Sequence, residues 1–199
     1  TALLEIEGAA GRYPSAVELG RHAEAAVARL GSPVSLEAPL RNAMGVVFDN
    51  LGRYEEAERE LRRALELRRG GGGDDGPEVA RVLTNLGNLA RNRRAYADAL
   101  ALHREALAID QRVLGEEHPA IGRHHHNIAR LLLATGNRDE ALASYERALA
   151  VETAAYGPTH VDVTVSRLAR RHGVDVEVGA APIAYRETVR RSATGEGRH

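Results

Sequence analysis

The sequence contains no cysteine, no tryptophan and no lysine, and it has a single phenylalanine. Without cysteine the chain can form neither disulfides nor thiolate metal sites, so we expect a reducing, cytoplasmic environment. Without lysine it cannot carry the G-x-x-x-x-G-K-[ST] loop that binds nucleotide phosphates. Every apolar run is shorter than the roughly 20 residues that cross a bilayer, so no membrane partner is expected.

The composition favours a folded helical protein. The chain has 199 residues, of which 43% are hydrophobic, and a net charge of -1, a balance that is untypical of a disordered chain. Aromatic residues make up only 4%, so the core must be built from alanine and leucine, which suits closely packed helices. There is no excess of basic residues, so nucleic acid is not an expected partner.

The most informative feature is an internal repeat with a period of 42 residues. The recurring sets are Ala57, Ala99 and Ala141; Ala64, Ala106 and Ala148; Leu65, Leu107 and Leu149; Gly45, Gly87 and Ala129; and Pro77 with Pro119. A fixed period of this size indicates a repeat array. Each unit is expected to be two helices that bury their apolar faces only when neighbouring units stack.

The repeat divides the chain into an array over residues 1–157 and a remainder over 158–199. Within the array we predict a partial repeat at 2–31 and full repeats at 38–69, 79–113 and 121–155. The helices are expected near 38–50, 54–69, 79–92, 96–113, 121–134 and 138–154. The predicted fold class is therefore an all-α superhelix of antiparallel helix pairs.

Three local features resemble the tetratricopeptide repeat family. They are the recurring small residues, the turn motif G-x-Y-x-x-A beginning at Gly52, and the linker L-G-E-E-H-P from Leu114 to Pro119. The period is similar to that of the longer, kinesin-light-chain type. The resemblance covers about residues 2–158 and implies a superhelix whose first helices line a concave, peptide-binding groove. Arg41 and His125 depart from the family pattern, which usually has an apolar residue there.

The family pattern also implies which residues face the groove. They are Asn42, Asp49, Arg81, Thr84, Asn85, Asn88, Arg91, Arg123, His126, Asn127 and Arg130. Arginine offers forked donors to carboxylates, and asparagine can both donate to and accept from a peptide backbone. This set predicts a protein or peptide partner of acidic character. The alternative is that these residues are an ordinary solvated helix surface.

No catalytic, cofactor or metal site is predicted. His124, His125 and His126 are adjacent, and successive helical residues point 100° apart, so they cannot close on one metal ion. We expect His126 to face the groove and to titrate near neutrality. Nucleophilic catalysis has no cysteine to use and no G-x-S-x-G motif, so we do not expect an enzyme.

The repeat fades after Gly157. Valines alternate with polar residues at 161–165 and again at 174–178, which predicts a short β-α-β-like appendage. The segment of about residues 158–199, and most clearly its motif A-Y-R-E-T-V at 184–189, resembles the junction between the third and fourth domains of translation elongation factor G. The factor's GTPase domain is missing from this sequence. An alternative interpretation makes Val165, Leu168 and Ala169 part of a fifth repeat helix that caps the array.

The sequence thus favours a non-catalytic protein-interaction scaffold that binds an acidic peptide. Two alternatives remain open at this point. One is the sensor arm of a larger, multidomain regulatory ATPase. The other is a fragment or fusion related to translation elongation factor G.

Overall fold

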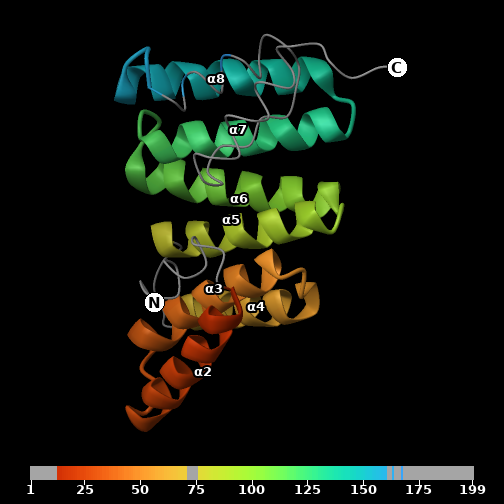
Figure 1. Ribbon diagram of the computed structural model, residues 1–199. Coiled ribbons are helices and arrows are strands. Elements are labelled where there is room, and N and C mark those ends of the chain that lie inside the picture. Colours follow the sequence, from red (N-terminus) through yellow and green to blue (C-terminus); the bar gives the residue numbers. More distant parts are fainter. Residues whose placement is uncertain (1–12, 71–75, 161–162, 164–166, 168–199) are drawn as a thin grey trace, which may run out of the picture.

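The computed structural model describes residues 13–70, 76–160, 163 and 167. Its helices are α2 (Tyr13–Arg29), α3 (Val34–Asn50), α4 (Tyr54–Gly70), α5 (Pro77–Asn92), α6 (Tyr96–Leu114), α7 (Pro119–Ala134) and α8 (Arg138–Tyr156). No strand occurs among the described residues. The helices stack in chain order from α2 at one end to α8 at the other, with α2 tilted away from the rest (Figure 1). The all-α repeat architecture is confirmed.

Each repeat is an antiparallel pair: α3 with α4, α5 with α6, and α7 with α8. The two helices of a pair approach closely because small residues line their contact. Ala57, Ala99 and Ala141 are completely buried, and so are Ala64, Ala106 and Ala148. Larger side chains fill the space between the helix pairs. Val82, Leu86 and Leu89 of α5, for example, pack in the same core as residues of α3 and α4. The core therefore runs from one repeat into the next.

The helix bounds agree with the prediction to within a few residues, except at α3. We expected a start near 38, but the helix begins at Val34 and includes Pro39. Pro39 gives up one backbone hydrogen bond, yet the flanking Ala38 and Leu40 are buried against the neighbouring helices. Packing of an amphipathic face outweighs that single lost bond, which is why the proline does not end the helix.

The β-α-β-like appendage is not supported. Val163 lies in the first stretch of alternating valines, and there it is helical and fully buried. Arg167, one turn further on, is also helical. The strand prediction is therefore wrong at Val163, because the local β-propensity of valine yields to helical packing at the end of the array. The remainder of the predicted appendage lies outside the described residues.

Candidate ligand-binding surface

Helix α5 carries five of the predicted groove residues on one face. Arg81, Thr84, Asn85, Asn88 and Arg91 are all partly exposed, whereas Val82, Leu83, Leu86, Gly87 and Leu89 of the same helix are buried. A strip of this kind follows from the helical period of 3.6 residues. The structure thus places these five side chains together, with hydrophilic groups available to a ligand.

Several of these side chains already have partners within the chain. Arg81 forms an ion pair with Glu78 at 2.7 Å, and the Thr84 hydroxyl donates to the Ala80 carbonyl oxygen at 2.8 Å. The hydrogen bond with Arg81 holds the pKa of Glu78 below its ordinary value, so this carboxylate offsets part of the positive charge of Arg81. The side chains at the Arg81 end of the strip are therefore held by contacts within α5.

On α3, the predicted Asn42 is buried rather than exposed. Its Oδ1 accepts a hydrogen bond from Asn85 Nδ2 at 2.9 Å, which links the first helices of two successive repeats. Asn42 therefore aligns the repeats, and its side chain does not face a ligand directly. Asp49, at the other end of α3, accepts two hydrogen bonds of 3.0 Å from Asn92 Nδ2.

Helix α7 differs from α5 in how far its predicted residues are exposed. Arg123 is exposed and Asn127 half-buried, but His126 is only 3% exposed and meets the Tyr145 ring edge-on at 5.3 Å between centroids. The expectation that His126 faces the groove is thus wrong. The aromatic ring of Tyr145 on α8 gives the imidazole a packing site, and this partner lies 19 residues away in the chain.

The other two adjacent histidines also have separate environments. His124 is buried, and its Nε2 lies 2.8 Å from Asp110 Oδ2 on α6. Burial lowers the pKa of His124, while the bond to Asp110 opposes that shift. Burial also lowers the pKa of His125, which lines a cavity of about 300 Å³ between α6 and α8 together with Arg104 and Arg147. Among the described residues, no three His, Asp or Glu side chains gather in a metal-binding arrangement.

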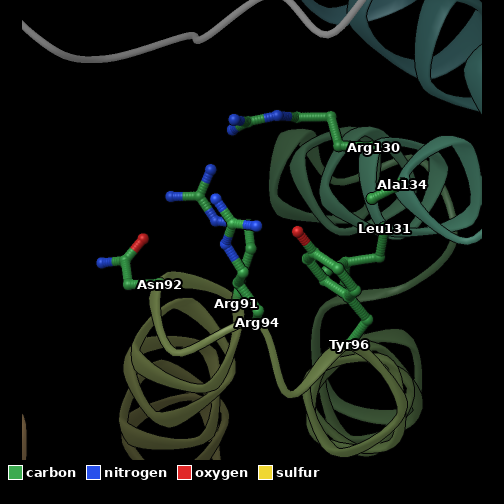
Figure 2. A pocket seen from close by; sticks show the side chains of 7 residues that line it. All are labelled: Arg91, Asn92, Arg94, Tyr96, Arg130, Leu131 and Ala134. Carbon is green, nitrogen blue, oxygen red and sulfur yellow. The ribbon is translucent and has the colours of Figure 1, made fainter.

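The strip on α5 ends at a cavity of about 200 Å³, which we call the arginine pocket. It is lined by Arg91, Asn92, Arg94, Tyr96, Arg130, Leu131 and Ala134. Figure 2 shows the guanidinium groups of Arg91 and Arg94 beside one another, with that of Arg130 across the same space and the Tyr96 hydroxyl turned towards it. None of the lining residues is acidic. The pocket therefore concentrates positive charge and hydrogen-bond donors.

Four elements build the pocket: the last turn of α5, the turn that follows it, the first residue of α6, and the C-terminal half of α7. Arg94 lies in the turn and has a left-handed backbone, with φ of 61°. In the neighbouring repeats the corresponding turn residues are Gly52 and Gly136, with φ of 71° and 85°. Glycine adopts this conformation without steric cost, whereas a side chain there is strained.

The sequence singled out Arg91 and Arg130, which both line the pocket although Arg130 is only 8% exposed, but not Arg94, Tyr96 or Asn92. The family pattern concerns the face of the first helix, whereas these three lie at the end of that helix, in the turn and at the start of α6. A signal was present nevertheless, since Arg94 replaces the glycine that the 42-residue period predicts. The side chain of Asn92 is oriented by its hydrogen bond to Asp49. Burial raises the pKa of the Asp49 carboxyl, although the hydrogen bond from Asn92 and the positive charge of Arg91 both act to lower it.

The described helices are too short or too polar to cross a membrane. Comparison with known families matches the tetratricopeptide repeat model to residues 35–109 and again to 78–154. The two matches together cover more than half of the sequence.

The chain belongs to the tetratricopeptide repeat family.

Solved structures share the fold of this chain. BtubC (BKLC) from P. vanneervenii superposes with a TM-score of 0.74 and 21% identity, over 99% of this chain and 80% of that one. A putative kinesin light chain of Podosopora anserina, with nearly identical TPR-like repeats, superposes with a TM-score of 0.71 and 19% identity, over 98% of this chain and 88% of that one. At these identities the likeness shows the fold alone, and it supports the kinesin-light-chain type of repeat.

A short segment has a second relationship. It is similar to elongation factor G of Thermotoga maritima, with 46% identity over 43 residues, which is 22% of this chain and 6% of the factor. The elongation factor G-like protein of the same organism is 51% identical over 43 residues. This tetratricopeptide repeat protein thus spans about 6% of the length of those relatives.

Proposed function

We propose that this tetratricopeptide repeat protein is an interaction scaffold that binds an acidic peptide along α5 and α7. The observation that carries the proposal is the partly exposed strip from Arg81 to Arg91, which continues into the arginine pocket. An extended peptide would lie along the strip and use Asn85 and Asn88 for its backbone. Its carboxylates would meet Arg91, Arg123 and Arg130.

The energetics favour moderate affinity. Hydrogen bonds to charged groups contribute roughly 1.5–3 kcal/mol each. Ordering a flexible peptide and several long side chains offsets much of that gain, so we expect micromolar dissociation constants. Arg81 and Arg123 are solvent-exposed in part, so added salt should weaken binding.

The test is a peptide array without sequence bias, followed by titration of the best binders in solution. The variants Arg91→Glu and Arg123→Glu should weaken binding of acidic peptides about tenfold or more. Arg104→Glu is the matched control, because Arg104 lies on α6 in the other cavity and the same charge change is made there. If Arg91→Glu and Arg123→Glu bind acidic peptides as tightly as Arg104→Glu does, the proposal is contradicted. An array that does not enrich acidic peptides contradicts it as well.

A second candidate rests on the elongation factor match. Residues 158–199 number 42, close to the 43 residues of the match, and this stretch contains A-Y-R-E-T-V. We propose that the match lies there, at the junction of the factor's third and fourth domains, and that the chain joins a repeat array at 1–157 to this fragment. Such a fusion would bring the array to a ribosome, and co-sedimentation of the full chain with ribosomes tests it. Loss of the chain from the ribosomal pellet on deleting 174–199 supports this candidate, and absence of the intact chain from the pellet excludes it.

A further inference from the structure

The cavity of about 300 Å³ between α6 and α8, which we call the α6–α8 cavity, has an apolar floor. Leu107 of α6 and Ile128 and Leu132 of α7 line it, and Ile128 and Leu132 are buried. Its volume lies at the lower end of the roughly 300–1,000 Å³ that is usual for small-molecule sites. The space is therefore large enough for a complete small molecule that has an apolar part.

The repeat period explains why this space is open. One period earlier, Leu83 of α5 and Leu102 of α6 pack in the same apolar cluster. The corresponding residues of the last repeat are His125 and Ser144, and both line the cavity. Serine is much shorter than leucine, so Ser144 does not fill the space that Leu102 fills in the repeat before it. The cavity thus arises from a change of residues at one position of the repeat.

His125 has no hydrogen-bond partner among the described residues, although it is only 9% exposed. Two periods earlier the corresponding residue is Arg41, whose Nη1 donates to Glu60 Oε2 at 3.0 Å. Ser144 occupies the position of Glu60 in the last repeat, but its hydroxyl donates to the Glu140 carbonyl oxygen at 2.9 Å. Buried polar side chains are normally hydrogen-bonded. The imidazole ring at the cavity therefore has hydrogen-bonding capacity available to a ligand.

Arg147 supplies a positive charge at the same cavity. Two periods earlier, Arg63 pairs with Glu66 at 3.4 Å, and the residues at these two positions of the last repeat are Arg147 and Ala150. Arg147 therefore lacks that partner, and it forms no ion pair with any other residue that the structure describes. Its guanidinium donors are available at the edge of the cavity.

The other charges at the cavity leave a balance of one positive charge. Arg104 and Glu140 both line it, and their opposite charges offset each other across 3.9 Å. Burial and the charge of Arg147 lower the pKa of His125 below 6.5, against the opposing charge of Glu116, so this ring is neutral at pH 7. A ligand with a single negative charge would match the cavity.

We propose that the α6–α8 cavity binds a small monocarboxylic acid, whose carboxylate meets Arg147 and His125 and whose apolar body covers the floor. A guanidinium group offers forked donors to a carboxylate, and a neutral imidazole adds one N–H donor. A dianion would leave one charge unmatched, and a sugar would leave the apolar floor without a partner. None of the predicted groove residues lines this cavity, so the site is separate from the α5–α7 peptide surface.

The experiment titrates phenylacetate and its uncharged amide, phenylacetamide, into the full chain at constant ionic strength. The readout is the imidazole NMR signal of His125, which is assigned by its loss in His125→Leu. Phenylacetate should shift this signal saturably, with a dissociation constant of about 1–10 mM for a ligand of this size. The amide should bind about tenfold more weakly. Equal affinities for the acid and the amide would overturn the proposal, and so would the absence of a saturable shift with both phenylacetate and 4-methylpentanoate.

Two variants change the cavity in different ways. Ser144→Leu restores the leucine of the preceding repeat, so it should abolish phenylacetate binding without lowering the melting temperature. Arg147→Gln keeps the cavity open and should weaken phenylacetate about tenfold while leaving phenylacetamide unchanged. Arg138→Gln is the matched control, because it removes the same charge from an exposed position at the start of the same helix. Phenylacetate binding that survives in both cavity variants, or that falls equally in Arg138→Gln, contradicts the assignment.

Discussion

The imidazole ring of His103 lies directly against Gly87: a Cβ placed on Gly87 would be 2.8 Å from His103 Nε2. The repeats before and after use other pairs at the same positions, Gly45 with Leu61 and Ala129 with Tyr145. The residue on the first helix is thus small wherever the residue facing it on the second helix is large.

Gly87→Ala should therefore destabilise the protein by about 1–3 kcal/mol, because the buried ring has nowhere to move. In a His103→Ala background the same change should stabilise by about 0.5–1 kcal/mol, since alanine is the better helix former once the ring is gone. Urea unfolding of the four proteins of this double-mutant cycle measures the coupling. A Gly87→Ala cost that is the same in both backgrounds would show that the contact does not limit this position.

His103 should also make stability depend on pH. It is 1% exposed, and both ring nitrogens are buried without a hydrogen-bond partner in the described part of the chain. Burial, with the nearby charges of His124, Arg91 and Arg130, lowers the pKa of His103 from 6.5 to about 3. Between these two values the unfolded chain binds a proton that the folded chain does not. Stability is therefore complete above pH 6.5 and falls as the pH drops towards 3.

His103→Leu, which copies Leu61 of the preceding repeat, tests this dependence. It should remove the part of the acid destabilisation that arises because the unfolded chain protonates His103, which is up to about 1.4 kcal/mol per pH unit within that window. At pH 7 it should stabilise the fold by about 1–3 kcal/mol, because two unsatisfied polar atoms leave the core. Thermal melts between pH 4 and 8 make the comparison, with His22→Leu as the exposed control. Parallel pH profiles for wild type and His103→Leu would contradict the prediction.

Ala99 is completely buried where α6 packs against α5. Ala99→Leu adds three carbon atoms at a contact that the period keeps small, so it should destabilise by about 1–3 kcal/mol. Ala97→Leu, at an exposed position of the same helix, is the control and should change stability by less than about 0.5 kcal/mol. An unchanged melting temperature for Ala99→Leu would mean that α5 and α6 do not pack in this register.

Arg41 explains why the first full repeat departs from the family pattern. Its Nη1 atom contacts Glu24 at 2.7 Å on α2 and Glu60 at 3.0 Å on α4, and its Nε lies 3.5 Å from Glu37. Arg41→Leu, the residue found one period later at 83, should destabilise by about 1–2 kcal/mol, because the three carboxylates then lose the cation that they share. Arg63, whose Nε lies 3.9 Å from Glu37, remains beside only one of them.

The control for Arg41 is Arg62→Leu. Arg62 is 68% exposed and, among the described residues, pairs with Glu58 of its own helix, so its loss should cost less than about 0.5 kcal/mol. Denaturant unfolding at low and high salt measures both variants. Similar costs for the two, or an Arg41→Leu cost that is independent of salt, would show that the network contributes little.

The period of 42 residues was enough to predict the helix pairs and the polar, partly exposed strip of α5, because both follow from the spacing of apolar and small residues. The period did not show where a residue on a predicted exposed face is covered by a side chain from another helix. His126 lies in the predicted face, but the ring of Tyr145 covers it. Likewise, the pairing of His124 with Asp110 joins two repeats, and neither residue recurs at the repeat spacing.

The pocket was harder to foresee than the strip. Its side chains come from the end of α5, from a turn, from the start of α6 and from α7, and no single helical period connects them. Arg94 was visible only as a departure from the repeat, and a departure becomes informative only once its backbone conformation and its neighbours are known. The pocket therefore depends on tertiary contacts that the sequence does not show, whereas the helix pairs could be predicted from the local periodicity.

The turn at Arg94 has a consequence for anyone who would engineer this array. Consensus design replaces each position by the residue most common among the repeats, and here it would write glycine at 94, between Gly52 and Gly136. The product should be the more thermostable protein. By the same substitution it would lose the Arg94 guanidinium group, which lines the arginine pocket.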